Sequence, residues 1–90
     1  MKYRVEVTSS AAKELRKLRR SIQPKLMKAI GDRISGLADE PRPPGAEKVE
    51  GYDYWRVRSG DYRIVYAVED EVLSVVIVRV GHRREVYRRL

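Results

Sequence analysis

The sequence has no cysteine and a single histidine, His82. Without cysteine the chain can form neither a disulfide, nor a thiolate zinc site, nor a cysteine nucleophile. One histidine cannot build a multi-histidine metal site, and no nucleophile-elbow motif accompanies it to favour a Ser-His-Asp arrangement. Neither the GxxxxGKS/T nor the GxGxxG pattern occurs, so no glycine-rich phosphate cradle is expected. We therefore expect no metal and no cofactor.

Long apolar runs are also missing. No stretch approaches the ~20 apolar residues of a membrane span, and the opening "MKYRVEVTSS" lacks the apolar core of a signal peptide. A hydrophobic share of 42% is typical of a folded chain, and 90 residues suffice for one core but not two. We expect one cytoplasmic domain that spans residues 1–90.

Acidic residues are outnumbered by basic ones, 13 to 20, which gives a net charge of +7. Fourteen of the 20 basic residues are arginine, whose planar fork matches phosphate better than the lysine ammonium does. This balance favours a polyanionic partner, which could be a nucleic acid, an acidic protein or an anionic membrane. The alternative is a basic domain that is merely well solvated.

Apolar residues at helical spacing predict two helices that form an αα-hairpin. The first follows candidate caps at Thr8, Ser9 and Ser10 and covers "SSAAKELRKLRR". The second covers residues 21–40, with Ser21 as its cap and Pro24 in its first turn. "DEPRPPGAE", the proline-rich stretch that comes next, is expected to be a loop.

The remaining segments predict strands. Alternation in "KYRVEV" indicates a first strand, and "KVEG" suggests a small edge strand after the loop. Three further strands are expected over residues 54–58, 61–69 and 72–80, and the last should be central because it is apolar on both faces. The prediction is an α+β fold, with both helices on one face of a mainly antiparallel four-stranded sheet and a short C-terminal helix.

The hairpin "DYWRVRSGDYRIVY" carries three arginines close to its own turn: Arg56, Arg58 and Arg63. A two-residue turn at Ser59-Gly60 would place Arg56 directly opposite Arg63, and like charges in that position destabilise a sheet. Such a pair either extends into water or binds an anion. Trp55 alternates with the arginines and should pack on the helices, which leaves the arginines on a free face.

More basic residues follow the last strand. Arg83 and Arg84 come just after Gly81, and Tyr87 lies three residues further on. If the strand brings Arg83 to the same end of the sheet, these guanidinium groups could grip a phosphodiester and stabilise the added charge of its transition state. The competing interpretation is a set of solvated arginines on an exposed sheet.

Taken together, "DYWRVRSGDYRIVY" and "VIVRVGHRREVYRRL" resemble the RelE/ParE superfamily of toxin–antitoxin toxins, on its RelE side. The resemblance covers nearly the whole chain. It implies a RelE-like fold with a curved sheet, and a metal-independent endonuclease that cuts mRNA in the ribosomal A site. The partners it implies are an acidic RelB-like antitoxin, the ribosome with its 16S rRNA, and mRNA, with no membrane among them.

The resemblance also implies roles for single residues. Arg63 would stabilise the transition state, and Arg83 would act on the phosphate and the leaving 5′-oxygen. Tyr87 would orient or stack on the substrate and accept the proton of the attacking 2′-hydroxyl. From their positions alone, Arg84 and Tyr54 are expected to contact the substrate beside these residues.

Arg56 and Arg58 occupy positions where well-known members of the superfamily have lysines. Arginine effectively cannot lose its proton, so Arg56 and Arg58 can hold phosphate but cannot serve as a base. The base must be Tyr87, His82, Glu85 or a ribosomal group. His82 has a second interpretation, as a structural or substrate-contacting residue after a strand.

Two other functions remain open from the sequence. A ParE-like protein would poison DNA gyrase with the same fold, although members of that branch lack the basic cluster and the tail tyrosine. A basic module could also bind RNA or an antitoxin without catalysis.

Overall fold

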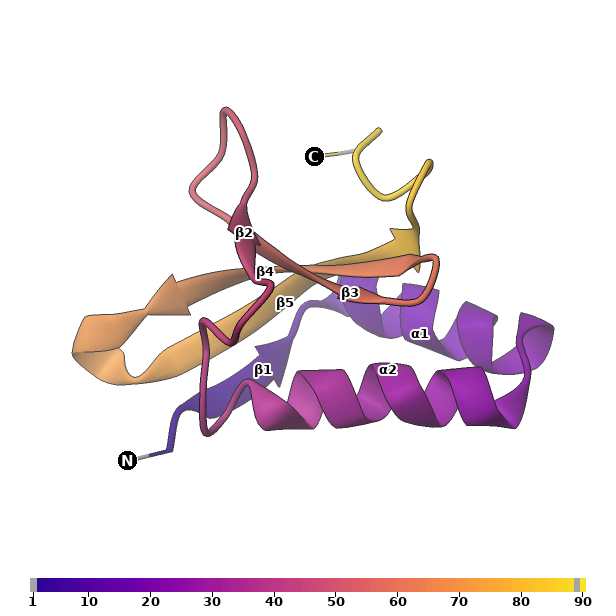
Figure 1. The fold of residues 1–90 in the computed structure, drawn as a ribbon, viewed down its shortest axis with the longest axis horizontal. Helices are drawn as coiled ribbons and strands as arrows, with labels where there is room; N and C mark the ends of the chain where they lie inside the picture. Colours follow the sequence, from indigo (N-terminus) through magenta and orange to yellow (C-terminus); the bar gives the residue numbers. More distant parts are fainter. Residues whose placement is uncertain (1, 89) are drawn as a thin grey trace.

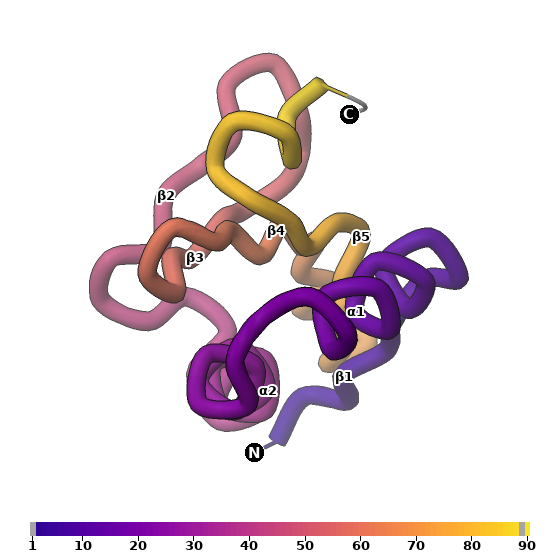
Figure 2. Tube along the Cα trace, turned by 90° about the vertical axis from the view of Figure 1, so that its right-hand side faces the viewer, coloured from indigo at the N-terminus to yellow at the C-terminus, as the bar shows by residue number. Residues whose placement is uncertain are grey.

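The sheet separates two helices on one side from a loop and the C-terminal tail on the other, as Figures 1 and 2 show from two directions. The computed structural model describes residues 2–88 and residue 90. The elements in chain order are β1 (Arg4–Val7), α1 (Ser9–Ser21), α2 (Pro24–Gly36), β2 (Glu47–Lys48), β3 (Trp55–Ser59), β4 (Tyr62–Glu69), the 3-10 helix η1 (Asp70–Val72) and β5 (Ser74–His82).

Helix α1 begins where its sequence predicts. The Thr8 side chain accepts a hydrogen bond from the Ala11 N–H at 3.1 Å, so one of the three expected caps is confirmed. Ala11 is fully buried beneath the sheet.

Helix α2 begins later and ends earlier than residues 21–40. Ser21, the expected cap, is instead the last residue of α1, where its Oγ donates to the Lys17 carbonyl oxygen at 3.1 Å. Pro24 occupies the first helical position, where a missing N–H costs no hydrogen bond. The described part of the chain contains no helix long and apolar enough to cross a membrane.

The sheet has five strands, not the four expected, because the short β2 adds an edge strand, and their order is β1-β5-β4-β3-β2. Strands β2 to β5 pair antiparallel as expected, but β1 runs parallel to β5 and makes the sheet mixed. Alternation in a sequence reveals a strand but not its partner, and here the partners lie at opposite ends of the chain. Strand β5 has neighbours on both sides, as its apolar faces predicted.

The β3–β4 hairpin turns one residue later than expected. Ser59 pairs with Tyr62, so the turn residues are Gly60 and Asp61, and Arg58 rather than Arg56 lies opposite Arg63. Gly60 has a φ of 60°, which suits the first central position of a type II′ turn, where glycine is favoured.

The sheet face toward the helices holds the main core. Its fully buried strand residues include Val57, Ile64, Tyr66 and Ile77, which pack with Ile30 of α2. Trp55 packs against this core, as expected.

The sequence had suggested that the opposite face of the sheet is free, but the structure shows that it is partly covered. A second cluster covers part of it, where Val49 from the β2–β3 loop and Val86 from the tail pack on Val65. The expected C-terminal helix is absent from the described tail, because residues 83–88 form consecutive turns. A segment of six residues cannot offset the cost of helix nucleation. The conformation of residues 83–88 is instead held by the packing of Val86 on the sheet.

A polar cluster joins the far end of the sheet to the proline-rich loop. Arg42 donates to both carboxylate oxygens of Asp70, at 3.1 and 2.9 Å, and the Tyr3 hydroxyl donates to the same carboxylate at 2.7 Å. These hydrogen bonds, that of Arg42 foremost, lower the pKa of Asp70 to about 2. Tyr66 donates to the Pro41 carbonyl oxygen at 2.7 Å and anchors the same loop.

Candidate functional site

Three arginines share the sheet face that lies away from the helices. Val57 points into the main core, so its neighbours Arg56 and Arg58 on β3 point to the opposite face. Arg63 is the cross-strand partner of Arg58 and shares that face with Val65. The sequence predicted this grouping, and the structure brings the three residues together on adjacent strands.

The guanidinium of Arg56 lies over the ring of Tyr87, with 5.5 Å between its Cζ and the ring centroid. The Tyr87 hydroxyl and the Arg56 Nε are both buried, and neither has a hydrogen-bond partner among the described residues. Buried polar atoms are normally paired, so two unsatisfied groups in one contact are unusual and mark this part of the sheet as a candidate site. We call Arg56, Arg58, Arg63 and Tyr87 the arginine face.

Glu47 is the residue that sequence reasoning missed. Its Oε1 lies 3.6 Å from Nη2 of Arg56 and 3.7 Å from Nη2 of Arg58. Pairing of β2 with β3 places Glu47 directly opposite Arg56. Because β2 has only two residues, its pairing partner could not be read from the sequence.

Arg63 binds its own turn. Its Nη1 donates to the carbonyl oxygens of Gly60 and Tyr62, each at 3.0 Å. The repulsion expected between paired arginines is therefore relieved only in part within the chain, since Arg58 faces Glu47 at 3.7 Å and Arg63 faces backbone oxygens.

The tail begins beside the hairpin turn. The Arg83 backbone N–H donates to the Asp61 carbonyl oxygen at 2.8 Å, while the Arg83 and Arg84 residues are exposed. Arg83 is thus next to the arginine face through its backbone. No hydrogen bond or ion pair of its guanidinium has been identified in the described structure.

His82 lies apart from the arginine face. It pairs with Tyr62, whose ring it meets edge-on at 5.9 Å, and Tyr62 packs toward the main core. Its Nδ1 accepts a long hydrogen bond of 3.4 Å from the Arg84 backbone N–H. The structure therefore does not bring His82 into contact with Tyr87 or the three arginines.

Tyr54 belongs to the second cluster. Its ring stacks on that of Tyr52, with centroids 5.8 Å apart and planes 5° apart, and Tyr52 donates to the Leu90 carbonyl oxygen at 3.1 Å. Tyr54 is therefore on the same side of the sheet as the arginine face, as expected for a residue that flanks it.

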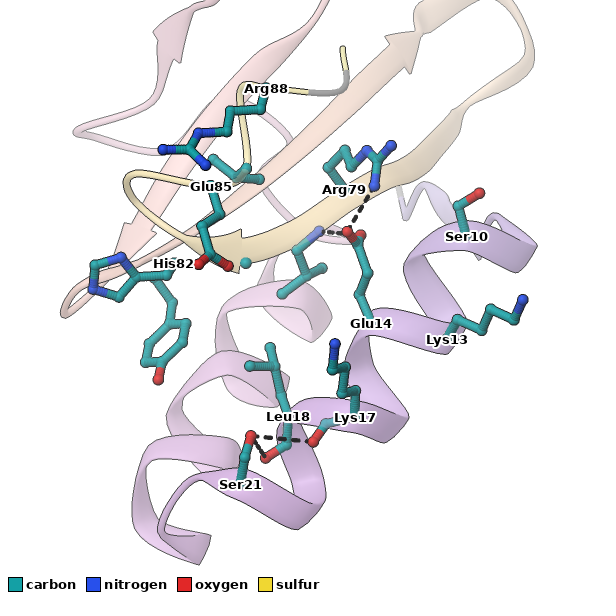
Figure 3. A pocket seen from close by; sticks show the side chains of 14 residues that line it. Ser10, Lys13, Glu14, Lys17, Leu18, Ser21, Arg79, His82, Glu85 and Arg88 are labelled. Atoms are coloured by element: carbon teal, nitrogen blue, oxygen red, sulfur yellow. Dashed lines mark hydrogen bonds and ion pairs between the residues drawn. The ribbon is translucent and has the colours of Figure 1, made fainter.

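A groove of about 940 Å³ lies between α1, the end of β5 and the tail. Figure 3 shows Glu85 and Lys17 directed into it from the tail and from α1. Glu14 closes one wall, since its carboxylate accepts from Arg79 at 2.7 Å and from the Val80 N–H at 3.0 Å. Sequence reasoning missed this groove because its walls come from segments distant in the chain.

The arrangement suits the binding of an anion. Guanidinium groups stay charged and donate in a fixed fork that matches phosphate. No group of three or more His, Cys, Asp or Glu residues that could hold a metal ion occurs within residues 2–88 and 90.

Comparisons with known proteins find toxins of type II toxin–antitoxin systems. Residues 5–87 match the family described as the ParE toxin of the type II toxin–antitoxin system parDE. The toxin RelG of Mycobacterium tuberculosis is 36% identical over 91 residues, which cover 99% of this chain and 100% of the relative.

Solved structures show the same fold. The toxin in the RelBE2 toxin–antitoxin complex of M. tuberculosis is 30% identical, with a TM-score of 0.74 over 92% of this chain and 100% of that one. The archaeal RelE–RelB complex of Pyrococcus horikoshii gives 27% identity and a TM-score of 0.77, over 96% of this chain and 100% of the other.

Proposed function

The chain belongs to the RelE/ParE family of type II toxins, and on that basis we propose that it is a ribosome-dependent mRNA endonuclease. It would cut the codon in the ribosomal A site and so inhibit translation. The observation that carries this proposal is the arginine face, where Arg56 and Tyr87 stack and Arg58 lies opposite Arg63. Preorganised cations of this kind stabilise the charge that develops on a reacting phosphate.

The proposed reaction uses the RNA's own 2′-hydroxyl as the nucleophile. The 2′-oxygen forms a bond to the adjacent phosphorus and the bond from phosphorus to the 5′-oxygen breaks. The products are a 2′,3′-cyclic phosphate and a 5′-hydroxyl end. The 2′-hydroxyl loses a proton and the departing 5′-oxygen gains one, so that atoms and charge balance.

Each residue of the arginine face has a part in this scheme. Arg56 and Arg58 would hold the scissile phosphate. Arg63 would exchange its bonds to Gly60 and Tyr62 for the added charge of the transition state. Arg83 would reach the phosphate and the leaving oxygen from the start of the tail.

Tyr87 is the residue that we assign to the 2′-hydroxyl. Of the three candidates from the sequence, Tyr87 contacts an arginine of the face, whereas His82 and Glu85 line the groove between α1 and β5. Its hydroxyl is buried and has no partner within the described chain, so a substrate that reaches it would supply the missing hydrogen bond. Tyr54 would contact a neighbouring nucleotide from the second cluster, and Arg84 would do so from the tail. The substrate contact expected for His82 is not favoured, because this last residue of β5 lies apart from the arginine face.

Toeprinting of an mRNA on purified ribosomes tests the proposal. We expect A-site cuts with the wild-type protein and none with Arg63→Ala. Arg4→Ala, on the far edge strand β1, removes the same charge and should cut like the wild type. Cutting by Arg63→Ala at the wild-type rate would contradict the proposed role of Arg63, and no cutting by folded wild type would contradict the function.

We propose an acidic antitoxin of the RelB type as the cellular partner. The complexes from M. tuberculosis and P. horikoshii pair relatives of this chain with such antitoxins. The net charge of +7 favours an acidic partner.

Gyrase poisoning is the second candidate, because the matching family model describes ParE toxins. The arginine face and Tyr87 argue against it, since the ParE-like branch lacks this basic cluster. Supercoiling and DNA-cleavage assays with purified gyrase separate the two functions. Inhibition of gyrase without any cut on ribosomes would favour this second candidate.

A further inference from the structure

Glu47 places a single oxygen between two arginines of the candidate site. Arg56 and Arg58 are alternate residues of β3 and so point to the same face, and both Nη2 atoms approach Oε1 of Glu47. The reaction scheme above gives Glu47 no part. Its position shows that this pair of guanidinium groups can converge on one anionic oxygen.

The contact is loose. Charge-assisted hydrogen bonds between nitrogen and a carboxylate are about 2.7–2.9 Å long, and the two contacts of Glu47 are 3.6 and 3.7 Å. The Glu47 side chain is 49% exposed, at the edge of the sheet. By contrast, Arg42 holds Asp70 through two hydrogen bonds of 3.1 and 2.9 Å. Charge alone therefore holds Glu47, and a better acceptor can replace it.

The arginines have donors to spare. The side chains of Arg56 and Arg58 are 29% and 61% exposed, and neither Nη2 lies within hydrogen-bond distance of Glu47. A phosphodiester carries two non-bridging oxygens and can accept from both forks at once, which the distant carboxylate of Glu47 does not do. Tyr87 adds an aromatic ring beside Arg56, a surface on which an RNA base can stack.

We propose that Glu47 is a built-in competitor that occupies the position of a substrate phosphate oxygen, and that an RNA phosphodiester displaces it from Arg56 and Arg58. This proposal deepens the proposed function and rests on it for the identity of the ligand. Displacement releases the carboxylate to solvent and exposes the full positive charge of the pair. Glu47 thereby weakens the binding of anions to the free protein.

Titrations followed by the arginine Nε–H signals in NMR spectra test this proposal without ribosomes. The probes are inorganic phosphate and a short RNA with a 2′-O-methyl group at each position, which cannot be cut because no free 2′-hydroxyl remains. Glu47→Gln should bind both about three- to tenfold more tightly than the wild type, because it removes two ion pairs that compete with the ligand. Glu71→Gln, in η1 and exposed, makes the same change in net charge and should stay within about twofold of the wild type.

A double-mutant cycle locates the effect. In an Arg58→Gln background, Glu47→Gln should no longer tighten binding by more than about twofold, since one of the two competing ion pairs is gone. Equal thermal midpoints for wild type and Glu47→Gln establish that both are folded. Binding by Glu47→Gln that is no tighter than that by Glu71→Gln would overturn the proposal.

An acidic peptide serves as a third probe. If Glu47→Gln gains affinity for the peptide but not for the oligonucleotide, the site binds carboxylates and the assignment to RNA is wrong. The outcome is independent of the proposed activity. Wild type that fails to cut on ribosomes would contradict the endonuclease, while the comparison of Glu47→Gln with Glu71→Gln would still decide whether Glu47 competes with phosphate.

Discussion

Arg58 lies directly opposite Arg63 across the β3–β4 hairpin, so two cations form a cross-strand pair. Such pairs destabilise a sheet, and this one persists because Glu47 faces Arg58 while Arg63 donates to the carbonyl oxygens of its own turn. Residues that reduce stability without a structural benefit are characteristic of functional sites. At this pair, therefore, a substitution should be able to raise the free energy of unfolding while it lowers activity.

Replacing Arg58 with threonine should make the protein more stable and less active. Arg58→Thr removes the like-charge pair and introduces a good strand former, so the free energy of unfolding should rise by about 0.3–1 kcal/mol. Cutting on ribosomes should fall at least tenfold, because one phosphate ligand is lost. Urea denaturation and toeprinting measure the two effects. A fall in the free energy of unfolding by more than about 1 kcal/mol would show that Arg58 supports the fold instead.

Loss of the hydroxyl from Tyr87 and from Tyr66 should change the free energy of unfolding in opposite directions. Tyr87→Phe removes a buried hydroxyl without a partner in the described structure, so the free energy of unfolding should rise by about 1 kcal/mol. Tyr66→Phe removes the donor to Pro41 and should lower it by about 1 kcal/mol.

Activity should follow the reverse order, since Tyr87→Phe should cut poorly while Tyr66→Phe should retain wild-type rates per folded molecule. Chemical denaturation of the two variants side by side provides the comparison. Equal destabilisation by both substitutions would mean that the Tyr87 hydroxyl is satisfied and not held for a ligand.

Acid should weaken the fold through Asp70. Its hydrogen bonds to Arg42 and Tyr3 lower its folded pKa to about 2 from an ordinary 3.8. A lowered pKa contributes stability that is fully present above the unfolded value, and this contribution is lost as the pH falls from about 4 to about 2. Asp70→Asn should therefore show a shallower loss of thermal midpoint over this interval. Parallel curves for variant and wild type would exclude Asp70 as the origin of the acid sensitivity.

Glu14 should stabilise the contact between α1 and β5. Its carboxylate accepts from Arg79 and from the Val80 N–H, and its side chain is only 27% exposed. Glu14→Leu should lower the free energy of unfolding by about 1–3 kcal/mol. Glu85→Gln, in the same groove, should change it by less than about 0.5 kcal/mol. A similar loss for both would attribute the effect to the charge of the groove rather than to the two hydrogen bonds.

Local chemistry allowed much of the fold to be predicted. The Thr8 cap, the existence of both helices and the alternation around Arg56 and Arg58 are short-range signals, and the structure confirms them. The prediction that Ser21 caps the second helix was wrong. A serine before a proline-containing helix is a good cap, but here its hydroxyl donates to a carbonyl oxygen of α1. The predicted position of the hairpin turn was wrong by one residue, because glycine can occupy either central position of such a turn and Gly60 occupies the first.

Long-range pairing lay beyond the sequence. The parallel union of β1 with β5, the approach of Glu47 to the arginines and the packing of Val86 on the sheet all join distant segments. None of these contacts carries a local periodicity. The arginines and Tyr87 were singled out from their positions in the hairpin and the tail, and the resemblance to a family added their roles. The acidic residue beside Arg56 and Arg58 emerged only from the structure.

The most direct test of the central claim is cleavage of ribosome-bound mRNA that carries one 2′-deoxynucleotide at the scissile position. If the arginine face holds a phosphate while the neighbouring 2′-hydroxyl attacks it, the substituted mRNA should remain uncut. The all-ribose mRNA should yield a 2′,3′-cyclic phosphate, detectable by mass spectrometry. Cleavage of the 2′-deoxy mRNA at the same position would contradict the account, because it would require a nucleophile other than the RNA itself.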